Sequence, residues 1–275
     1  MVSTLKNKLN FFEEFKEFYF KIIKDFKFDY QEDCKARNYL SEILIKKKHN
    51  WDLENVIKSL NSQLISKTEI LIYGCGPSLE ETVDAILKRK GRLFFDKFIN
   101  LAANGASVLL RKKHIKINAI FSDLDGITKR EFDYANFNIV HAHGDNINKL
   151  IQFEKRILRF QNIIGTTQVE PLENVLNPGG FTDGDRILYF IHKLIKPLQK
   201  LYFIGMDFDN IIGKYSKLNI KKNQEGTKSK IKKLQYGIEL LEWIKTRIKN
   251  EVYVVNSKIF SEKFNYISVS DLLKI

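Results

Sequence analysis

Short apolar runs alternate with longer amphipathic stretches from Glu69 onward. A short apolar run is typical of a buried strand, whereas apolar residues spaced three and four apart line one face of a helix. The runs predict strands at Ile70–Tyr73, Phe98–Ala102, Ala119–Phe121, Ile139–Ala142, Asn162–Gly165, Leu201–Gly205 and Val252–Asn256. The amphipathic stretches predict helices at Leu79–Lys90, Ala106–Lys112, Ile147–Phe160, Asp185–Leu194 and Lys230–Ile248. This alternation indicates an α/β fold, built on a mostly parallel, doubly wound sheet with helices on both faces.

The first 66 residues have a helical pattern instead. One apolar face recurs at steps of three and four, at Leu5, Leu9, Phe12, Phe15, Tyr19 and Ile22. Further helical patterns follow Asp33 and the pair Trp51-Asp52. We predict a helical N-terminal segment (residues 1–66) that packs on an α/β domain (residues 67–275), with its aromatic face in the core.

The composition fits one large domain, or one domain with a small appendage. The chain has 275 residues, of which 44% are hydrophobic, enough to bury a sizeable core. Its two cysteines, Cys34 and Cys75, have neither C-x-x-C nor zinc spacing, which favours a reducing compartment. No apolar run is long enough to span a membrane, and the start of the chain lacks the apolar region of a secretory signal. We therefore expect a cytoplasmic protein with no membrane partner.

The net charge of +13 allows several kinds of partner. A basic chain can bind nucleic acid, a membrane surface or an anionic small substrate. A surface dominated by lysine, in a chain rich in Lys, Asn and Ile, accounts for most of this charge without any partner. One basic stretch with no long apolar run, Lys214 to Lys230, is either a mobile lid over a polyphosphate or a solvated loop.

Two carboxylates, Asp123 and Asp125, follow the apolar run Ala119–Phe121. Residues two apart in a strand point to the same face, and Gly126 lets the backbone turn away, so we expect both carboxylates to point the same way. The ligand crevice of an open α/β sheet lies beyond the carboxyl ends of its strands. Two hard oxygen anions there suit Mg²⁺ carrying a phosphorylated substrate. Alternatively, the two acids only cap a helix.

Glycines follow the first strand of the sheet, in the sequence Gly74-Cys-Gly76-Pro77-Ser78. They allow close backbone approach, and the helix start that follows offers free N–H groups to an anion. Ser78 is also a candidate N-cap, with Glu81 as its capping-box partner. A phosphate contact and an ordinary tight turn are equally compatible with this motif. The glycine pattern is incomplete for a dinucleotide-binding fingerprint.

Polar residues also end the next strands. Asn104 lies among small residues that leave room either for a ligand or for close helix packing. His141 and His143 share one face of their strand, which suits a transition-metal pair or two hydrogen-bonded structural histidines. Asp145 either joins the carboxylate cluster or caps the helix after it.

A second Asp-x-Asp pair, Asp183 and Asp185, opens the helix after a Gly-Gly turn. Thr182 or Asp183 is the candidate N-cap, and Gly180 with its neighbouring glycine suits a bound phosphate. Arg186 either adds positive charge to the site or only forms a salt bridge. Capping alone would not require two glycines and two further acids.

A third pair, Asp207 and Asp209, ends the sixth predicted strand and is followed by Lys214. A P-loop is excluded because Phe208 and Tyr215 stand where it needs glycine and a hydroxyl residue. Carboxylates brought together repel each other unless cations neutralise them. Three pairs at three strand ends therefore favour a bound divalent metal.

Taken together, these segments resemble the archaeal 6-hydroxymethyl-7,8-dihydropterin diphosphokinase family. The matching pieces, in the family's order over residues 69–216, are Gly-Cys-Gly-Pro-Ser-Leu-Glu, Ala-Ala-Asn-Gly-Ala, Ser-Asp-Leu-Asp-Gly, Val-His-Ala-His-Gly-Asp-Asn, Gly-Gly-Phe-Thr-Asp-Gly-Asp-Arg, and Gly-Met-Asp-Phe with Ile-Gly-Lys-Tyr-Ser. The N-terminal part, with Asp25, Phe26 and Asp33, is similar too. The family is expected to carry Asp where this chain has Asn104. The layout is also similar to that of thiamine pyrophosphokinases.

The resemblance implies an enzyme of pterin-cofactor biosynthesis, with residues 67–275 as its catalytic domain. It implies Mg²⁺-dependent transfer of diphosphate from ATP to the hydroxymethyl group of 6-hydroxymethyl-7,8-dihydropterin, with release of AMP. The implied Mg²⁺ ligands are Asp123, Asp125, Asp145 and Asp183. Catalysis is assigned to Asp123, Asp125, Asp183 and Lys214, with His143 as the base, and contacts to ATP or pterin are assigned to Gly74, Gly76, Pro77, Ser78, Asn104, Gly180, Thr182 and Arg186.

Two other functions stay open from the sequence. A nucleotide-sugar glycosyltransferase would use an Asp-x-Asp pair equally well to hold a metal-bound nucleotide. A nucleic-acid-binding protein would account for the basic run 214–233, although acids in the cleft would repel a phosphate backbone, so we expect no stable nucleic-acid complex. Whether the pathway leads to folate or to a methanopterin-type carrier stays open, as does self-association into a homo-oligomer.

Overall fold

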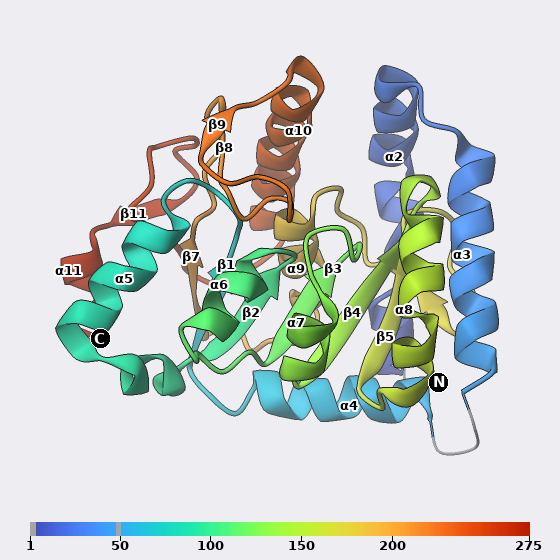
Figure 1. Cartoon of the computed structure of the whole chain (residues 1–275), viewed down its shortest axis with the longest axis horizontal. Helices are drawn as coiled ribbons and strands as arrows, with labels where there is room; N and C mark the ends of the chain where they lie inside the picture. Colours follow the sequence, from blue (N-terminus) through green and yellow to red (C-terminus); the bar gives the residue numbers. More distant parts are fainter. Residues whose placement is uncertain (1–3, 48–50) are drawn as a thin grey trace.

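The computed structural model describes residues 4–47 and 51–275, and it confirms the α/β fold (Figure 1). Within these residues, nine strands form one sheet in the order β11-β10-β7-β1-β2-β3-β4-β5-β6, and all neighbouring strands are parallel. The strands with a clear apolar run are β1 (Glu69–Tyr73), β2 (Ile99–Ala103), β3 (Ala119–Ser122), β4 (Phe137–Ala142), β5 (Ile163–Thr167), β7 (Lys200–Ile204) and β10 (Val252–Val255). They overlap all the predicted strands, because strands buried on both faces read as continuous apolar runs.

The shortest strands have no such signal. β6 (Val175–Leu176) and β11 (Asn265–Ile267) extend the two edges of the sheet. β8 (Ile211–Ile212) and β9 (Gln224–Glu225) form a separate antiparallel hairpin around part of the basic stretch. Strands of two or three residues are too short for their periodicity to be recognised in the sequence.

Helices cover both faces of the sheet. One face packs against α5 (Leu79–Lys90), η1 (Arg92–Lys97), α6 (Ala106–Lys112) and α11 (Val269–Leu272), and the other against α9 (Asp183–Ile191) and α10 (Lys228–Lys245). Near β4 and β5 lie α7 (Lys129–Tyr134), η2 (Gly144–Asn146) and α8 (Ile147–Arg159). The pattern does not predict α7 and α11, which have only six and four residues.

The N-terminal segment is helical, as predicted, and forms α1 (Leu5–Lys8), α2 (Phe12–Phe26), α3 (Tyr30–Ile45) and α4 (Leu53–Leu64). The single apolar face that the pattern predicts is divided between α1 and α2. The helix is interrupted at Asn10 and Phe11, because both residues bind Asn177 instead. Phe11 N–H donates to Asn177 O at 2.6 Å, and Asn177 N–H donates to Asn10 Oδ1 at 3.0 Å. The second predicted helix is confirmed, but it begins before Asp33, since α3 starts at Tyr30 and Asp33 lies in its first turn.

The N-terminal helices share their core with the sheet. The aromatic face of α2 is buried in the same apolar cluster as α4, α9 and residues of β1 and β2. The division of the chain at residue 66 stays a prediction, and residues 1–3 and 48–50 of that segment lie outside the described part. None of the described helices combines the length and the apolar character that crossing a membrane requires.

Candidate active site

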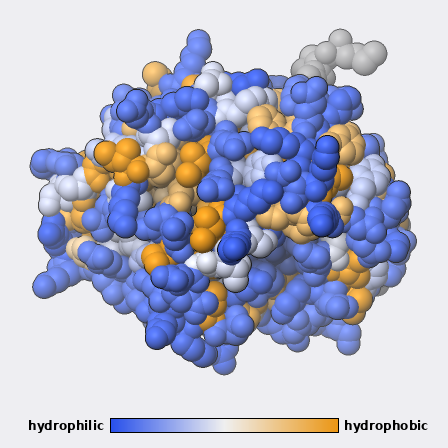
Figure 2. Space-filling model, turned by 90° about the horizontal axis from the view of Figure 1, so that it is seen from above, coloured by the Kyte–Doolittle hydropathy of each residue, from blue (hydrophilic) through white to orange (hydrophobic). Residues whose placement is uncertain are grey.

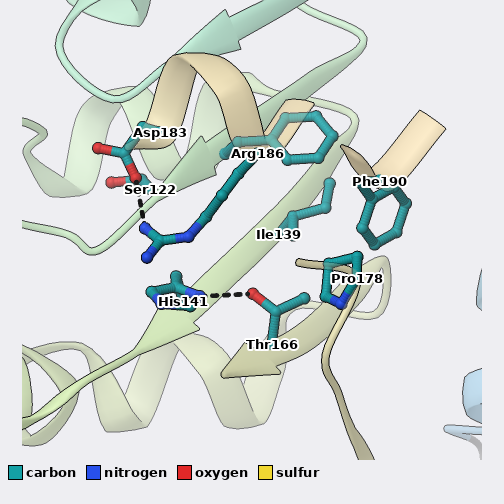
Figure 3. A pocket seen from close by; sticks show the side chains of 9 residues that line it. Ser122, Ile139, His141, Thr166, Pro178, Asp183, Arg186 and Phe190 are labelled. Carbon is teal, nitrogen blue, oxygen red and sulfur yellow. Dashed lines mark hydrogen bonds and ion pairs between the residues drawn. The ribbon is translucent and has the colours of Figure 1, made fainter. Parts of the chain in front are cut away.

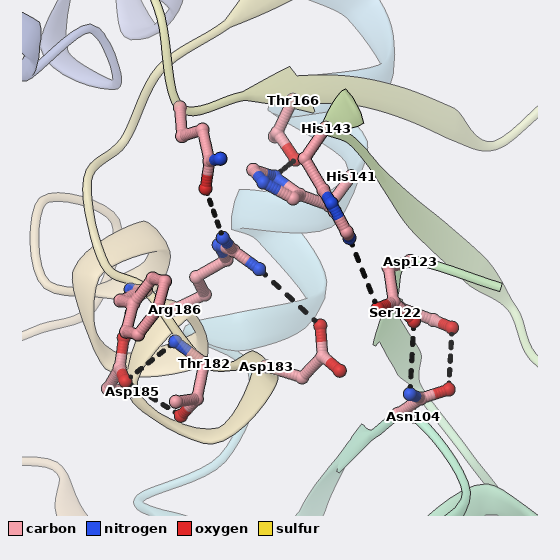
Figure 4. Close-up of polar contacts among 12 residues, drawn as sticks. Asn104, Ser122, Asp123, His141, His143, Thr166, Thr182, Asp183, Asp185 and Arg186 are labelled. Atoms are coloured by element: carbon pink, nitrogen blue, oxygen red, sulfur yellow. Dashed lines mark hydrogen bonds and ion pairs between the residues drawn. The ribbon is translucent and has the colours of Figure 1, made fainter. Parts of the chain in front are cut away.

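The predicted carboxylate pair follows β3, which lies between β2 and β4 in the sheet, and Figure 4 shows its first member, Asp123, beside Asn104 and His143. Asp123 and Asp125 occupy the turn after β3. The side-chain amide of Asn104, just after β2, donates to Oδ1 of Asp123 at 3.1 Å and to Oδ1 of Asp125 at 2.7 Å. Its own Oδ1 accepts from the Ser122 hydroxyl at 2.9 Å and from Gly126 N–H at 3.0 Å. One buried amide therefore holds both carboxylates on the same side of the turn.

The turn itself differs from the prediction. Leu124, not Gly126, has the left-handed backbone conformation, with φ of 71°. Leu124 N–H donates to the Ser122 hydroxyl at 2.8 Å, which secures this conformation. Gly126 is required for another reason, because a Cβ there would lie 2.7 Å from Oδ1 of Asn104. The glycine makes room for the amide that holds the carboxylates.

The two carboxylates have opposite pKa shifts. Burial raises the pKa of Asp125, and the charge of Asp123 raises it further. Burial alone would also raise the pKa of Asp123, but the hydrogen bond and the charge of His143 outweigh burial and lower it. His143 Nε2 lies 3.4 Å from Oδ2 of Asp123. The pair thus carries negative charge that nearby cations would stabilise.

A third carboxylate, Asp183, lines a small cavity together with Ser122 and Arg186 (Figure 3). Burial and then the charge of Asp123 raise the pKa of Asp183 well above its usual range. Its Oδ1 lies 3.7 Å from Nη1 of Arg186. Within the described residues, three buried atoms around this cavity lack a hydrogen-bond partner, namely Asp183 Oδ1, Arg186 Nε and His141 Nε2. The cavity therefore has a largely apolar lining, which includes Phe121, Ile139 and Phe190, and a few polar groups that the described residues leave incompletely satisfied.

His141 does not lie beside Asp123 as His143 does. Its ring is buried, and Nδ1 lies 3.1 Å from the Thr166 hydroxyl, which itself donates to Val140 O. Burial, and then the charge of Arg186, lower the pKa of His141 well below its usual range. His141 is thus a neutral, hydrogen-bonded histidine, and its ring centroid lies 5.9 Å from that of His143.

A buried network connects the N-terminal segment to this cavity. Asp33 accepts from Gly144 N–H at 2.7 Å, from the Tyr19 hydroxyl at 2.8 Å and from Gln168 Nε2 at 2.7 Å. Gln168 Oε1 in turn accepts from Nη2 of Arg186 at 3.1 Å. The loop after His143 and the Arg186 guanidinium are therefore positioned through one carboxylate on α3, which the sequence pattern gives no reason to connect with β4 or α9.

Replacing Asp33 with asparagine should lower the free energy of unfolding by about 2 kcal/mol, because one of its charged hydrogen bonds is lost and a buried donor is left unpaired. Urea unfolding measures this loss. Asp133→Asn is the matched control, since Asp133 is exposed and pairs with Arg156 at the surface, and its effect should stay within about 0.5 kcal/mol. Equal stability of the two variants would contradict the role of the network.

Two of the acids from the other Asp-x-Asp pairs cap helices. Asp185 accepts from Thr182 N–H, the Thr182 hydroxyl and Phe181 N–H, which confirms Thr182 as the N-cap of α9. Asp207 accepts from Ser78 N–H at 2.8 Å and from the Ser78 hydroxyl at 2.9 Å. The predicted capping box of Ser78 with Glu81 is wrong, because the Ser78 hydroxyl is engaged by Asp207. At the start of α5, the Asp207 carboxylate thus accepts the hydrogen bonds that a bound anion would otherwise accept.

The predicted phosphate-binding glycines lie against the protein backbone. A Cβ at Gly74 would lie 2.5 Å from Gly205 O, and one at Gly76 would lie 2.7 Å from the same carbonyl. The loop at Gly213 passes directly over the backbone of Cys75 and Gly76. Gly180 has φ of 87°, and a Cβ there would lie 2.8 Å from Asp185 Oδ1. Close packing thus accounts for these glycines, and their contact with a ligand stays a prediction.

A second pocket, with a volume of about 200 Å³, lies beside the start of α5. Its lining includes Pro77, Lys214, Lys221 and Lys222. Lys214 forms an ion pair with Glu80, so its charge is already neutralised. Lys221 and Lys222 are exposed. The predicted residues Pro77 and Lys214 therefore line this pocket, whose lining includes neither Asp123 nor Asp125.

Three further lysines lie closer to the carboxylates than the sequence motifs suggest. Lys217 Nζ lies 3.7 Å from Oδ2 of Asp125. On α10, Lys230 and Lys233 carry charges that act on Asp183 and Asp123 respectively. They belong to the basic run of the sequence, but no spacing within that run distinguishes them from the solvated lysines.

The residues at the carboxyl end of β3 fit Mg²⁺. Among the described residues, no group of three or more His, Cys, Asp or Glu side chains is arranged to hold a metal ion by itself. Mg²⁺ usually takes only one or two carboxylates and completes its shell with water and substrate phosphates. Asp123 and Asp125 supply such a pair of hard oxygen donors, and Asp183 offers a buried oxygen without a hydrogen-bond partner in the described structure. Asp145 is exposed on η2, and its part in metal binding stays a prediction.

Comparisons with known proteins agree on one family. The model of the family described as 6-hydroxymethylpterin diphosphokinase MptE-like matches residues 42–213. A protein named 6-hydroxymethyl-7,8-dihydropterin pyrophosphokinase from Pyrococcus furiosus is 35% identical over 235 residues, which cover 85% of this chain and 94% of that protein. A protein of the same name from Methanocaldococcus jannaschii is 35% identical over 248 residues, which cover 87% of this chain and 98% of that protein.

A likeness to a solved structure is weaker. A glycosyltransferase from Magnetospirillum magneticum AMB-1 matches 75% of this chain and 34% of its own, with a TM-score of 0.45 and 13% identity. This likeness is too low to support an argument about function.

Proposed function

This chain belongs to the family described as 6-hydroxymethylpterin diphosphokinase MptE-like, and from that membership we propose that it transfers diphosphate from ATP to 6-hydroxymethyl-7,8-dihydropterin. The relatives' name supports a kinase-type transferase that acts on a pterin. The observation that carries the proposal is the Asp123–Asp125 pair, held by the Asn104 amide at the carboxyl edge of the sheet.

In the proposed reaction, the hydroxymethyl oxygen of the pterin attacks the β-phosphorus of ATP. A new P–O bond forms to the pterin, and the bond from the β-phosphorus to the oxygen that bridges it to the α-phosphorus breaks. AMP leaves with that oxygen. His143, which lies beside Asp123, is the group we assign to take the hydroxyl proton. Such transfers depend mainly on positioning and on neutralising charge.

The proposed Mg²⁺ ligands are Asp123 and Asp125, with Asp183 as a further candidate. When bound, Mg²⁺ would neutralise phosphate oxygens and make phosphorus a better electrophile. Lys217 and Lys230 lie where they can add positive charge to the transferred group, since their charges already act on Asp125 and Asp183. The charge of Arg186, whose Nη1 lies 3.7 Å from Oδ1 of Asp183, favours the ionised form of this carboxyl.

The choice between ATP and a sugar nucleotide as the donor substrate tests this function. The purified protein, ATP, Mg²⁺ and 6-hydroxymethyl-7,8-dihydropterin should release AMP in proportion to the pterin consumed, and chelation by EDTA should abolish the release. Chromatography of the nucleotides distinguishes AMP from ADP. Release of ADP, or turnover with a sugar nucleotide and none with ATP, would contradict the proposal.

A further inference from the structure

Four aromatic rings gather beside the carboxylate site, and they come from three separate parts of the chain. Phe26 ends α2, Phe28 follows it, Phe181 precedes the N-cap of α9, and Tyr236 lies on α10. The rings of Phe26 and Phe28 are stacked, with centroids 5.3 Å apart and planes at 15°. Phe181 lies 5.6 Å from Phe26. Phe26 and Phe28 are half-buried, so the cluster reaches the surface.

This cluster lies on the face of the molecule that holds the carboxylates. Figure 1 shows α2 and α10 rising above the carboxyl edge of the sheet. The Tyr236 hydroxyl donates to Asp25 Oδ2 at 2.7 Å, which connects α10 to the end of α2. Phe181 is two residues before Asp183. Figure 2 shows this face from above, where hydrophobic patches interrupt a mostly hydrophilic surface.

A lysine with an unusual environment lies over these rings. Lys233 Nζ is 5.1 Å from the ring centroid of Phe28, 5.6 Å from that of Phe181 and 6.0 Å from that of Phe26. Within the described residues, no carboxylate pairs with this ammonium group and no oxygen accepts a hydrogen bond from it. Its neighbour Lys232, in contrast, pairs with Asp25. Lys233 therefore offers three N–H donors that the protein leaves without an acceptor.

The position of Lys233 connects the rings to the acids. Burial, and then the charge of Lys230, lower the pKa of Lys233, while the charges of Asp145 and Asp123 act in the opposite direction. An ammonium group held on aromatic faces is stabilised by cation–π attraction, but it gains more if a ligand oxygen also accepts its hydrogen bonds. The site thus combines flat apolar faces with a donor next to the metal-binding candidates.

We propose that Phe26, Phe28 and Phe181 form the face against which the bicyclic ring of the pterin packs, and that Lys233 donates a hydrogen bond to its ring carbonyl. This assignment rests on the proposed function. A dihydropterin is a planar heterocycle with a carbonyl oxygen, so it matches aromatic faces beside a free donor. Its hydroxymethyl arm is then free to extend toward Asp123 and Asp125.

The same chemistry disfavours this cluster as the phosphate site. ATP carries several negative charges, whereas of the two lysines that lie over the Phe26 ring, Lys232 already pairs with Asp25 and Lys233 lies among apolar rings. The pocket beside α5, lined by Lys221 and Lys222, suits phosphates better. The two substrates would then approach the carboxylates from different sides, as transfer between them requires.

Equilibrium binding of the pterin without ATP tests the assignment. Lys233→Met keeps the length of the side chain but removes its charge and donors, and it should raise the Kd for 6-hydroxymethyl-7,8-dihydropterin about tenfold. Phe28→Leu should raise the same Kd about fivefold, since it removes one aromatic face. Neither variant should change the KM for ATP. Calorimetric titration and steady-state kinetics measure these constants.

Lys228→Met is the matched control, because Lys228 is exposed at the start of the same helix and loses the same charge. Its Kd for the pterin should equal that of the unaltered protein. Unchanged pterin binding in both Lys233→Met and Phe28→Leu would overturn the assignment, as would an equal rise in the KM for ATP. If the unaltered protein makes no pterin diphosphate at all, the proposed function fails; if it does and the folded variants match it, only this subsite fails.

Discussion

Asp123→Asn and Asp125→Asn should each lower turnover of ATP and pterin by about a thousandfold. Each change removes one negative charge from the pair that we assign to Mg²⁺, while the side chain keeps its size and one oxygen. The fold should tolerate Asp125→Asn, because burial and the neighbouring acid already raise the pKa of Asp125. Its thermal unfolding midpoint should stay within about 2 °C of the unaltered protein. The midpoint of Asp123→Asn should fall further, because this change also removes the charged contact with His143 that lowers the pKa of Asp123. Steady-state kinetics and thermal melting provide the two readouts.

Asp209→Asn is the matched control for this prediction. It changes an acid of the same Asp-x-Asp pattern at another strand end, but Asp209 pairs with Lys258 on the surface. Its turnover should be near that of the unaltered protein. Near-normal turnover in either Asp123→Asn or Asp125→Asn would contradict the assigned metal site. Equal losses of turnover in all three variants would show that the effect is not specific to the acids at the carboxyl end of β3.

The second large effect concerns Asn104, where the family resemblance anticipates Asp. Asn104→Asp would replace the amide that donates to Asp123 and Asp125 with a third carboxylate. Without a divalent cation, the lost charged hydrogen bonds and the added repulsion should cost about 3 kcal/mol of unfolding free energy. Mg²⁺ should recover most of this loss, because three carboxylates bind the cation more strongly than two. Urea unfolding in EDTA and in Mg²⁺ measures both values.

Screening by salt must be separated from binding in this experiment. Sodium chloride at the same ionic strength serves as the control, since it screens charge without coordinating the carboxylates. The variant should respond to Mg²⁺ much more than to sodium chloride. A variant as stable as the unaltered protein in EDTA would show that the Asn104 amide does not stabilise the two carboxylates.

The sheet and the central acids could be predicted because their signals are local. Each long strand is a continuous apolar run, and Asp123 and Asp125 follow one of them directly. Strand alternation places such residues at one edge of the sheet without any knowledge of long-range contacts. The same reasoning predicts that Asn104 and His143 lie at the carboxyl ends of their strands, and the structure places both in contact with Asp123.

The roles of the other acids could not be predicted, since they depend on contacts between distant segments. Asp207 and Asp185 share the Asp-x-Asp pattern with Asp123, yet Asp207 caps α5 from 129 residues away and Asp185 caps its own helix. Asp33 reaches Gly144 across 111 residues. A pattern of residue types cannot distinguish an acid that is available to bind a cation from one that already accepts hydrogen bonds from the protein.

Phosphorus NMR of the protein with ATP, Mg²⁺ and 6-hydroxymethyl-7,8-dihydropterin tests the central claim most directly. The account predicts that the ATP signals are replaced by those of AMP and of a new pterin diphosphate, and that neither appears when Mg²⁺ or the pterin is left out. ATP that stays unchanged in the complete mixture would contradict the account.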